Sequence, residues 1–321
     1  MTVSPALVSS AFSGATFVPT GDEIIGAPQF ARRCAVVIEG NYKPGDHVPK
    51  GPTRPTITVN GEANDLRVKF KLKYPFIYAP NLGEISVYNL APESRQQSVG
   101  KGVRVGVICG YGRDTKLAGV INAIQINHKH EGPDWISKFE GSNGGNAANN
   151  ARVNKTFGAG AGLADAIKGL AGGLGRLGKA SEATVRDKAG TKAWKNGKSL
   201  YGNLADEFRG VLDEIGLEYT VYDDNVVIVP KGGTTSELWA IGPDSGLVGS
   251  PEYAAPPMPG KPQLLKVKIL MNPVLRPGGK VILESATHGG VFRLRDVEHS
   301  GDTHSGDWYS TLELEGLRGA K

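Results

Sequence analysis

The chain has 321 residues, which corresponds to about two domains of ordinary size and is long enough to bury a sizeable core without a metal or a disulfide. Its net charge of +5 is modest, and the lysines form local clusters rather than a long basic stripe, so specific nucleic-acid binding is not indicated. No segment reaches the roughly 18 to 20 apolar residues of a membrane span, and residues 1–20 lack the features of a signal peptide. We therefore expect no membrane insertion and assembly in a cytoplasm.

The N-terminal half begins with a segment of low periodicity and continues with short β runs. Residues 1–30 are rich in Ser, Gly, Pro and Ala, which predicts an arm that binds a partner. The clearest strand is 66–74, where apolar residues alternate with three lysines. Evenly spaced short strands are typical of a barrel or sandwich. Further strands are predicted at 34–38, 56–59, 84–90, 102–109 and 118–127.

A change of composition divides this β region from a helical segment. The Gly- and Asn-rich run 141–150 predicts a flexible link, with a domain boundary near residue 155. Apolar residues spaced by three and four predict amphipathic helices at 163–177 and 200–215. A hairpin at 218–229 completes a compact α/β insert. After the insert, strands are predicted again at 264–271, 279–284, 291–297 and 308–315.

Two segments of the β regions resemble each other. The run 119–128 ends in His128 and is followed by Asp134-Trp135-Ile-Ser137, and the run 290–299 ends in His299 and is followed by Asp307-Trp308-Tyr-Ser310. Any two β-hairpins share some features, but the repeated Asp-Trp-x-Ser favours a duplicated module. Three chains with two modules each would give a three-fold ring with pseudo-six-fold symmetry, which fits the end of a hexameric tube.

These and other segments resemble the baseplate hub proteins of contractile-tailed phages, the late-control or tail-protein D group, which is also related to the upper part of type VI secretion spikes. The resemblance runs in order over residues of about 30 to 320 and is stronger than any single motif. It does not extend to the N-terminal arm. It is carried by 83–90, 106–112, 118–121, 243–252, 275–278, 299–302 and 307–309.

The resemblance implies a fold, a set of partners and a role. The expected fold is mainly β with an α+β insert: an arm at 1–30, a first tube-like β-barrel module at 31–155, an α/β insert at 156–235 and a second, related barrel at 236–321. The expected assembly is a homotrimer in the virion's tail baseplate that joins the hexameric tail tube to the central spike. Its expected partners are tail tube, spike and other baseplate proteins, with tape-measure protein and DNA only passing through the lumen during genome ejection.

The glycine motif and the serines do not form a convincing chemical site. Gly173-Leu-Gly-Arg-Leu-Gly178 fits G-x-G-x-x-G, but a dinucleotide site needs a preceding strand, and here the preceding segment is predicted to be helical. Ser245 and Ser250 lack the G-x-S-x-G elbow of a nucleophile. Cys34 and Cys109 lie in apolar runs, which predicts buried reduced thiols.

The histidines and tryptophans are also interpreted as structural. His128 with His130, and His299 with Asp302 and His304, could ligate a metal, but the sequence places both sets in exposed hairpin loops and supplies no cysteine beside them. Trp135 and Trp308 are interpreted as indoles that pack in the core rather than as a sugar platform.

We therefore expect no enzyme activity, no catalytic, cofactor-binding or metal-binding residues and no cofactor. The alternative is a glycan-binding or cell-wall-hydrolysing tail component, which would need an exposed aromatic groove or a pair of carboxylates at a fixed separation. The sequence marks no such pair.

Overall fold

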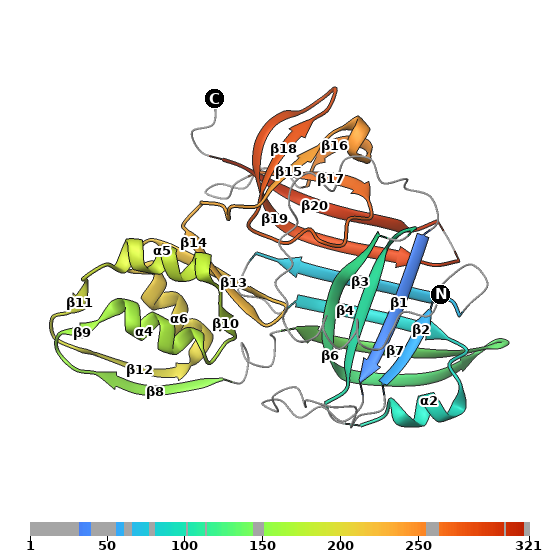
Figure 1. Cartoon of the computed structure of the whole chain (residues 1–321), viewed down its shortest axis with the longest axis horizontal. Coiled ribbons are helices and arrows are strands. Elements are labelled where there is room, and N and C mark those ends of the chain that lie inside the picture. Colours follow the sequence, from blue (N-terminus) through green and yellow to red (C-terminus); the bar gives the residue numbers. More distant parts are fainter. Residues whose placement is uncertain are drawn as a thin grey trace.

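The computed structural model describes residues 32–39, 56–60, 66–76, 81–100, 102–112, 114–143, 151–254, 263–304 and 306–317. The predicted arm at 1–30 lies outside the described residues. The protein is mainly β and consists of two β modules, with a smaller α/β insert beside them (Figure 1). Within the described residues, no helix is long and apolar enough to cross a membrane.

Within its described residues, the first β module contains seven strands and one short helix. The strand β3 illustrates how these sequences form strands: its apolar residues are buried and its lysines are exposed in strict alternation. Helix α2 connects β4 to β5 and begins at Pro92, a residue favoured in the first turn of a helix. The elements are β1 Arg32–Glu39, β2 Thr56–Asn60, β3 Val68–Pro75, β4 Asn81–Tyr88, α2 Pro92–Gln97, β5 Arg104–Tyr111, β6 Asp114–Glu131 and β7 Asp134–Asn143.

The second β module follows the insert, and its described part has six strands. The sequence indicated four of these strands but missed the first two, which are short or interrupted by glycine and proline. The elements are β15 Leu238–Ile241, the short 3-10 helix η1 Pro243–Ser245, β16 Leu247–Tyr253, β17 Leu264–Leu270, β18 Lys280–Glu284, β19 Gly289–Asp302 and β20 Trp308–Gly316.

All strands of the two modules belong to one 13-stranded sheet. Its order is β16-β17-β20-β19-β3-β4-β7-β6-β5-β1-β2, with β15 and β18 attached beside β19. The modules join where β19 pairs antiparallel with β3, so that His299 lies opposite Leu72. We call this pairing the seam. Every pair in the main path is antiparallel. Because successive side chains of a strand point to opposite sides of the sheet, alternate residues can face the core.

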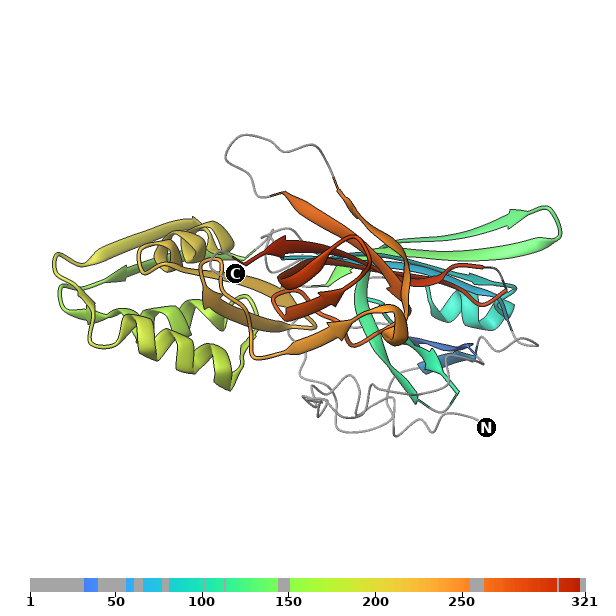
Figure 2. The ribbon, with the colours of Figure 1, turned by 90° about the horizontal axis from the view of Figure 1, so that it is seen from above.

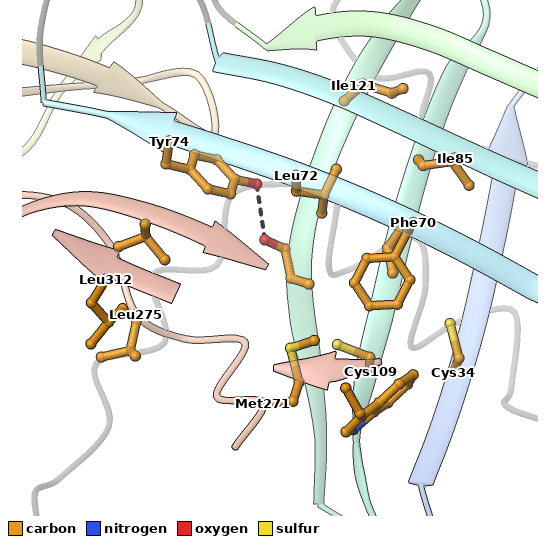
Figure 3. Packing of buried hydrophobic residues seen from close by; sticks show 14 of the residues in the cluster. Cys34, Phe70, Leu72, Tyr74, Ile85, Cys109, Ile121, Met271, Leu275 and Leu312 are labelled. Atoms are coloured by element: carbon orange, nitrogen blue, oxygen red, sulfur yellow. Dashed lines mark hydrogen bonds between the residues drawn. The ribbon is translucent and has the colours of Figure 1, made fainter. Parts of the chain in front are cut away.

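The two modules also share one hydrophobic core. Buried side chains from β1, β3 to β7, β15 and β17 to β20 form a single contiguous cluster. Figure 3 draws Phe70 and Leu72 of the first module together with Leu275 and Leu312 of the second as members of this cluster. Tyr74 is 2% exposed and donates a hydrogen bond of 2.9 Å to the carbonyl of Ala118 (Figure 3). Shared burial of this kind is expected to make the two modules unfold together.

The α/β insert has a separate core beneath three helices. The predicted helix at 163–177 is too long: α4 ends at Ala171, before a glycine-rich turn that leads into β10. The predicted helix at 200–215 begins too early, because residues 198–203 pair with β8 and Asn203 caps α6 by accepting from the backbone of Ala205. Helix α5 was not predicted. The elements are β8 Arg152–Phe157, β9 Ala161–Gly162, α4 Leu163–Ala171, β10 Arg176–Leu177, α5 Lys179–Ala189, β11 Ala193–Trp194, β12 Lys198–Asn203, α6 Leu204–Asp213, β13 Leu217–Tyr222 and β14 Asn225–Pro230.

Candidate assembly surface

The two hairpins that resemble each other in sequence are also built alike. In β6–β7, His128 lies opposite Ser137, and its Nδ1 is 2.9 Å from the serine hydroxyl. In β19–β20, His299 lies opposite Ser310 at the same Nδ1–Oγ distance of 2.9 Å. The duplicated sequence therefore produces a duplicated cross-strand contact.

The irregularities of the two hairpins coincide as well. A β-bulge interrupts β6 between Ala123 and Gln125, four residues before His128, and another interrupts β19 between Leu294 and Asp296 at the same distance from His299. A bulge is a specific feature of a strand rather than a consequence of any hairpin. The coincidence supports a duplication more strongly than strand pairing alone.

The histidines of these hairpins do not lie in loops, as the sequence interpretation had placed them. Strands β6 and β19 continue to Glu131 and Asp302, so His128, His130 and His299 are strand residues. Those predictions were wrong because the polar end of each strand looks like a loop when its neighbouring strand is unknown. His299 is fully buried, and His128 is half-buried.

The histidines and the aspartate that were weighed as metal ligands, and interpreted as structural, do not form a metal site in the described residues. Asp302 is 2% exposed and binds Arg67, with Nε–Oδ1 and Nη2–Oδ2 distances of 3.1 and 2.6 Å. His304 is exposed beyond the end of β19. Among the residues that the structure describes, no group of three or more His, Cys, Asp or Glu side chains could hold a metal ion.

The buried imidazole of His299 leads to a prediction about acid stability. Burial, and then the positive charge of Arg276, lowers the pKa of His299 to about 3, whereas an unfolded histidine titrates near pH ~6.5. Between these values the unfolded chain binds a proton that the folded chain does not, so the free energy of unfolding falls as the pH falls, by at most about 1.4 kcal/mol per pH unit. In His299→Gln, we expect a shallower loss of stability between about pH 7 and about pH 5, measured by urea unfolding. The exposed control His304→Gln should keep the slope of the unaltered protein, and equal slopes for all three proteins would contradict the prediction.

The seam carries a row of ion pairs on the face opposite the core. Lys71 Nζ lies 3.0 Å from Glu298 Oε1, and the bidentate pair of Arg67 with Asp302 closes one end of the seam. The backbones of Val68 and Thr303 also bond, with Thr303 donating over 3.0 Å. Because one partner of each pair comes from each module, these contacts fix the register in which the modules join.

The same face is broad and mixed in charge. On β4 and β7, Lys138 lies between two carboxylates, 3.1 Å from Glu84 and 2.6 Å from Glu140. An open hollow of about 440 Å³ crosses β3, β4, β7 and β6. Its lining contains no aromatic side chain and consists of Lys71, Lys73, Leu82, Gly83, Glu84, Ile124, Gln125, Glu140 and Gly141.

A buried arginine joins the insert to both β modules. Arg276, from the loop between β17 and β18, donates from Nε to Asp223 over 2.8 Å and from Nη2 to the carbonyl of Ala118 over 3.0 Å. Burial is the largest single influence and by itself would lower the pKa of Arg276, but Asp223, Tyr74 and Tyr222 together outweigh it and the pKa is raised. The guanidinium also lies 4.7 Å from the centre of the Tyr74 ring. One side chain therefore contacts the second module, the first module and the insert.

The hairpin β13–β14 of the insert supplies further carboxylates to the same region. Its two-residue turn, Asp223-Asp224, has φ values of 49° and 61°, as a tight hairpin turn requires. Glu218 lies 2.6 Å from Arg293 of β19, and Asp224 lies 3.5 Å from Arg104 of β5. Three arginines of the β modules thus bind three carboxylates of one hairpin, which orients the insert on the sheet.

The glycine motif and the serines have structural positions. Gly173–Gly178 follows α4, forms β10 and ends where α5 begins, so it does not follow a strand as a dinucleotide-binding loop does. Ser245 belongs to the 3-10 helix, where its hydroxyl accepts from the backbone of Gly242 over 2.6 Å. Ser250 is exposed in the irregular part of β16.

The two cysteines are buried, unbonded and directly opposite each other on β1 and β5. Burial raises the pKa of both thiols, which keeps them protonated. The prediction of buried reduced thiols is confirmed. Their opposition across the strands could not be seen in the sequence.

The two tryptophans differ, although they occupy equivalent positions. Trp308 is fully buried and packs edge-on against Phe70, with ring centres 5.8 Å apart. Trp135 is 40% exposed at the end of the β6–β7 hairpin, with the Arg95 guanidinium 4.0 Å from its ring centre. The prediction of a core indole is confirmed for Trp308 and wrong for Trp135. In Figure 2, this hairpin projects past the other strands.

Sequence comparisons find no relatives: no protein-family model matches the chain, and no curated protein matches it. Solved structures do resemble it. A tail protein from Neisseria meningitidis is 9% identical with a TM-score of 0.57, over 88% of this chain and 96% of that one. A prophage MuSo2 tail protein from Shewanella oneidensis is 7% identical with a TM-score of 0.55, over 88% and 98%. A chain of the Francisella PdpA-VgrG complex is 8% identical with a TM-score of 0.53, over 94% of this chain and 54% of that one. At these identities the likeness establishes the fold, which the chain shares with these two tail proteins and with a chain of the PdpA-VgrG complex.

Proposed function

We propose that the protein is a structural component of a phage tail, and that it forms a trimeric hub ring that joins the hexameric tail tube to the central spike. The observation that carries this proposal is the edge-to-edge junction of two modules with duplicated hairpins in one sheet. Three chains of this kind supply six similar modules, which match a six-fold tube on one side and a three-fold spike on the other.

In this ring, the broad face of β16, β17, β20, β19, β3, β4, β7 and β6 would line the lumen. Its positive and negative side chains are paired across strands, as in Lys71 with Glu298 and Lys138 with Glu84. A surface with balanced charges holds passing DNA and tape-measure protein weakly, because it has no continuous basic stripe. The insert and the arm would then bind neighbouring baseplate proteins from the outside.

The proposed division of the chain is an arm at 1–30, a barrel module at 31–155, an insert at 156–235 and a second barrel module at 236–321. We propose a non-enzymatic role in the virion's tail baseplate, after assembly in the host cytoplasm. The hollow on the broad face has no aromatic lining, so it offers no platform for a sugar ring. Glycan binding or wall hydrolysis remains the second candidate because Trp135 is exposed.

Multi-angle light scattering of the full chain, alone and with tail tube and spike proteins, tests the proposal. We expect a mass near three chains, at least when those partners are present. A mass of one chain under every condition would contradict the hub. Binding or cleavage of cell-wall oligosaccharides by that monomer would favour the alternative.

A further inference from the structure

We propose that the outer edge of β6, residues Gln125–Glu131, pairs with β16 of a second copy of the chain, in the register in which β19 pairs with β3 inside one chain. This inference rests on the proposed function and names the surface that closes its ring. It follows from the internal duplication, because the structure already contains one example of the junction.

The free edge of β6 corresponds to the part of β19 that forms the seam. The first half of β19 pairs with β18 and its second half pairs with β3. The first half of β6 pairs likewise with β5, but on the same edge its second half, Gln125–Glu131, has no partner strand among the described residues. The bulges at Ala123/Gln125 and Leu294/Asp296 mark the same division in both strands.

Strand β16 corresponds in the same way to β3. Strand β3 pairs with β4, which pairs with β7, and β16 pairs with β17, which pairs with β20. Positions in the two modules can be matched by following the strand pairings outward from the equivalent serines Ser137 and Ser310. In this match, Leu72 of β3 corresponds to Tyr253 of β16, and Lys71 corresponds to Glu252. Strand β16 is one end of the sheet, and within the described residues no strand pairs with its outer edge. Within one chain β16 and β6 lie at opposite ends of the run β16-β17-β20-β19-β3-β4-β7-β6 and do not pair, so their pairing requires a second copy.

Burial differs between the seam and the free edges as this correspondence requires. At the seam, His299 and Leu72 are 0% and 1% exposed. At the free edges, the equivalent His128 is half-buried and Tyr253 is 58% exposed. A pairing between two chains with the geometry of the seam would cover both side chains. Both are aromatic, so their burial would stabilise the pairing.

The predicted register also places opposite charges together. At the seam, Ser300 of β19 lies opposite Lys71. Lys129 is the equivalent of Ser300, and Glu252 is the equivalent of Lys71, so between chains Lys129 is expected opposite Glu252 of the second copy. Opposite charges on directly facing residues stabilise a strand pair, and like charges would oppose it. A bulge in β16 between Val248 and Glu252 limits this register to the end of the strand that contains Glu252.

Trp135 lies on β7, directly opposite His130 of the free part of β6. Its equivalent, Trp308, is buried against Phe70 of β3, so Trp135 is expected to be buried against β16 of the second copy. Large aromatic side chains that become buried in this way dominate the affinity of protein interfaces. The interface is heterologous, since β6 of each copy meets β16 of the next, and such contacts form rings when the rotation closes.

Disulfide cross-linking of the full-length protein tests the register. Directly opposed residues of antiparallel strands have Cα atoms about 4.5–5.5 Å apart, within the range that a disulfide spans. We expect the double variant Lys129→Cys with Glu252→Cys to form covalent dimers and trimers under mild oxidation. The control Asn127→Cys with Val248→Cys, which combines positions that this register does not place opposite each other, should remain largely uncross-linked. The natural thiols, Cys34 and Cys109, are buried.

The outcomes separate this inference from the proposed function. A trimer by light scattering without cross-links in the first pair, or with equal cross-linking in both pairs, would overturn the register and leave the hub intact. A monomer in all conditions would overturn both. As a second measurement, Trp135→Ala should weaken self-association by about tenfold or more, while Tyr201→Ala, an exposed aromatic change in the insert, should not. Unchanged association of Trp135→Ala would oppose the predicted role of this side chain.

Discussion

Replacing Arg276 by methionine is expected to lower the free energy of unfolding by about 3–5 kcal/mol, because it removes a buried guanidinium and leaves Asp223 and several carbonyls without this donor. Arg276 is 7% exposed, and its side chain donates to Asp223 and to carbonyls of both β modules, including those of Pro273 and Leu117. Methionine fills part of the volume but supplies no donor for these groups. Denaturant unfolding followed by tryptophan fluorescence measures the effect.

A matched control shows whether the effect of Arg276→Met comes from the burial of this arginine or from the loss of any paired arginine. Arg209 forms a pair of 3.0 Å with Asp206 on the surface of α6, where its side chain is 43% exposed. Exposed pairs contribute about 0–1 kcal/mol, so Arg209→Met is expected to change stability by no more than about that amount. Similar effects of Arg276→Met and Arg209→Met would show that the buried arginine does not hold the three parts together.

The sequence predicted the β modules well wherever one face of a strand meets water. The alternation of Phe70 and Leu72 with lysines correctly indicated β3, because period-two burial is a local property of a half-buried strand. The same reasoning failed for residues 198–203, where the apolar Leu200 and the polar residues around it fit a helix and a strand about equally. Their pairing with β8 decides the outcome, and that partner is about forty residues away in the sequence.

The candidate surface could be predicted only in part. The repeated Asp-Trp-x-Ser correctly indicated two related hairpins, since both place a histidine opposite a serine. The seam could not be predicted, because the pair of Arg67 with Asp302 joins residues 235 positions apart and depends on which strand edges meet. For the same reason, the sequence could not distinguish the buried His299 from the half-buried His128.

Trp308→Ala is expected to lower the free energy of unfolding by about 3–5 kcal/mol, the usual cost of truncating a buried tryptophan. The indole is fully buried where the two modules join, and Gly301 leaves space for it: a Cβ on that glycine would lie 2.5 Å from the Phe70 ring and 2.9 Å from the indole. Truncation therefore opens a cavity in the shared core rather than in one module. Denaturant unfolding followed by far-ultraviolet circular dichroism measures the loss.

The duplication provides the control, because Trp135 occupies the equivalent position in the first module. It is 40% exposed, so Trp135→Ala removes less buried surface and should lower the free energy of unfolding of the isolated chain by clearly less than Trp308→Ala. The two substitutions should therefore act on different properties: that of Trp308 on folding, and that of Trp135 on contact with a second copy. Equal losses of folding stability would mean that the two hairpins are already equally covered within one chain, and the asymmetry on which the proposed interface depends would then be absent.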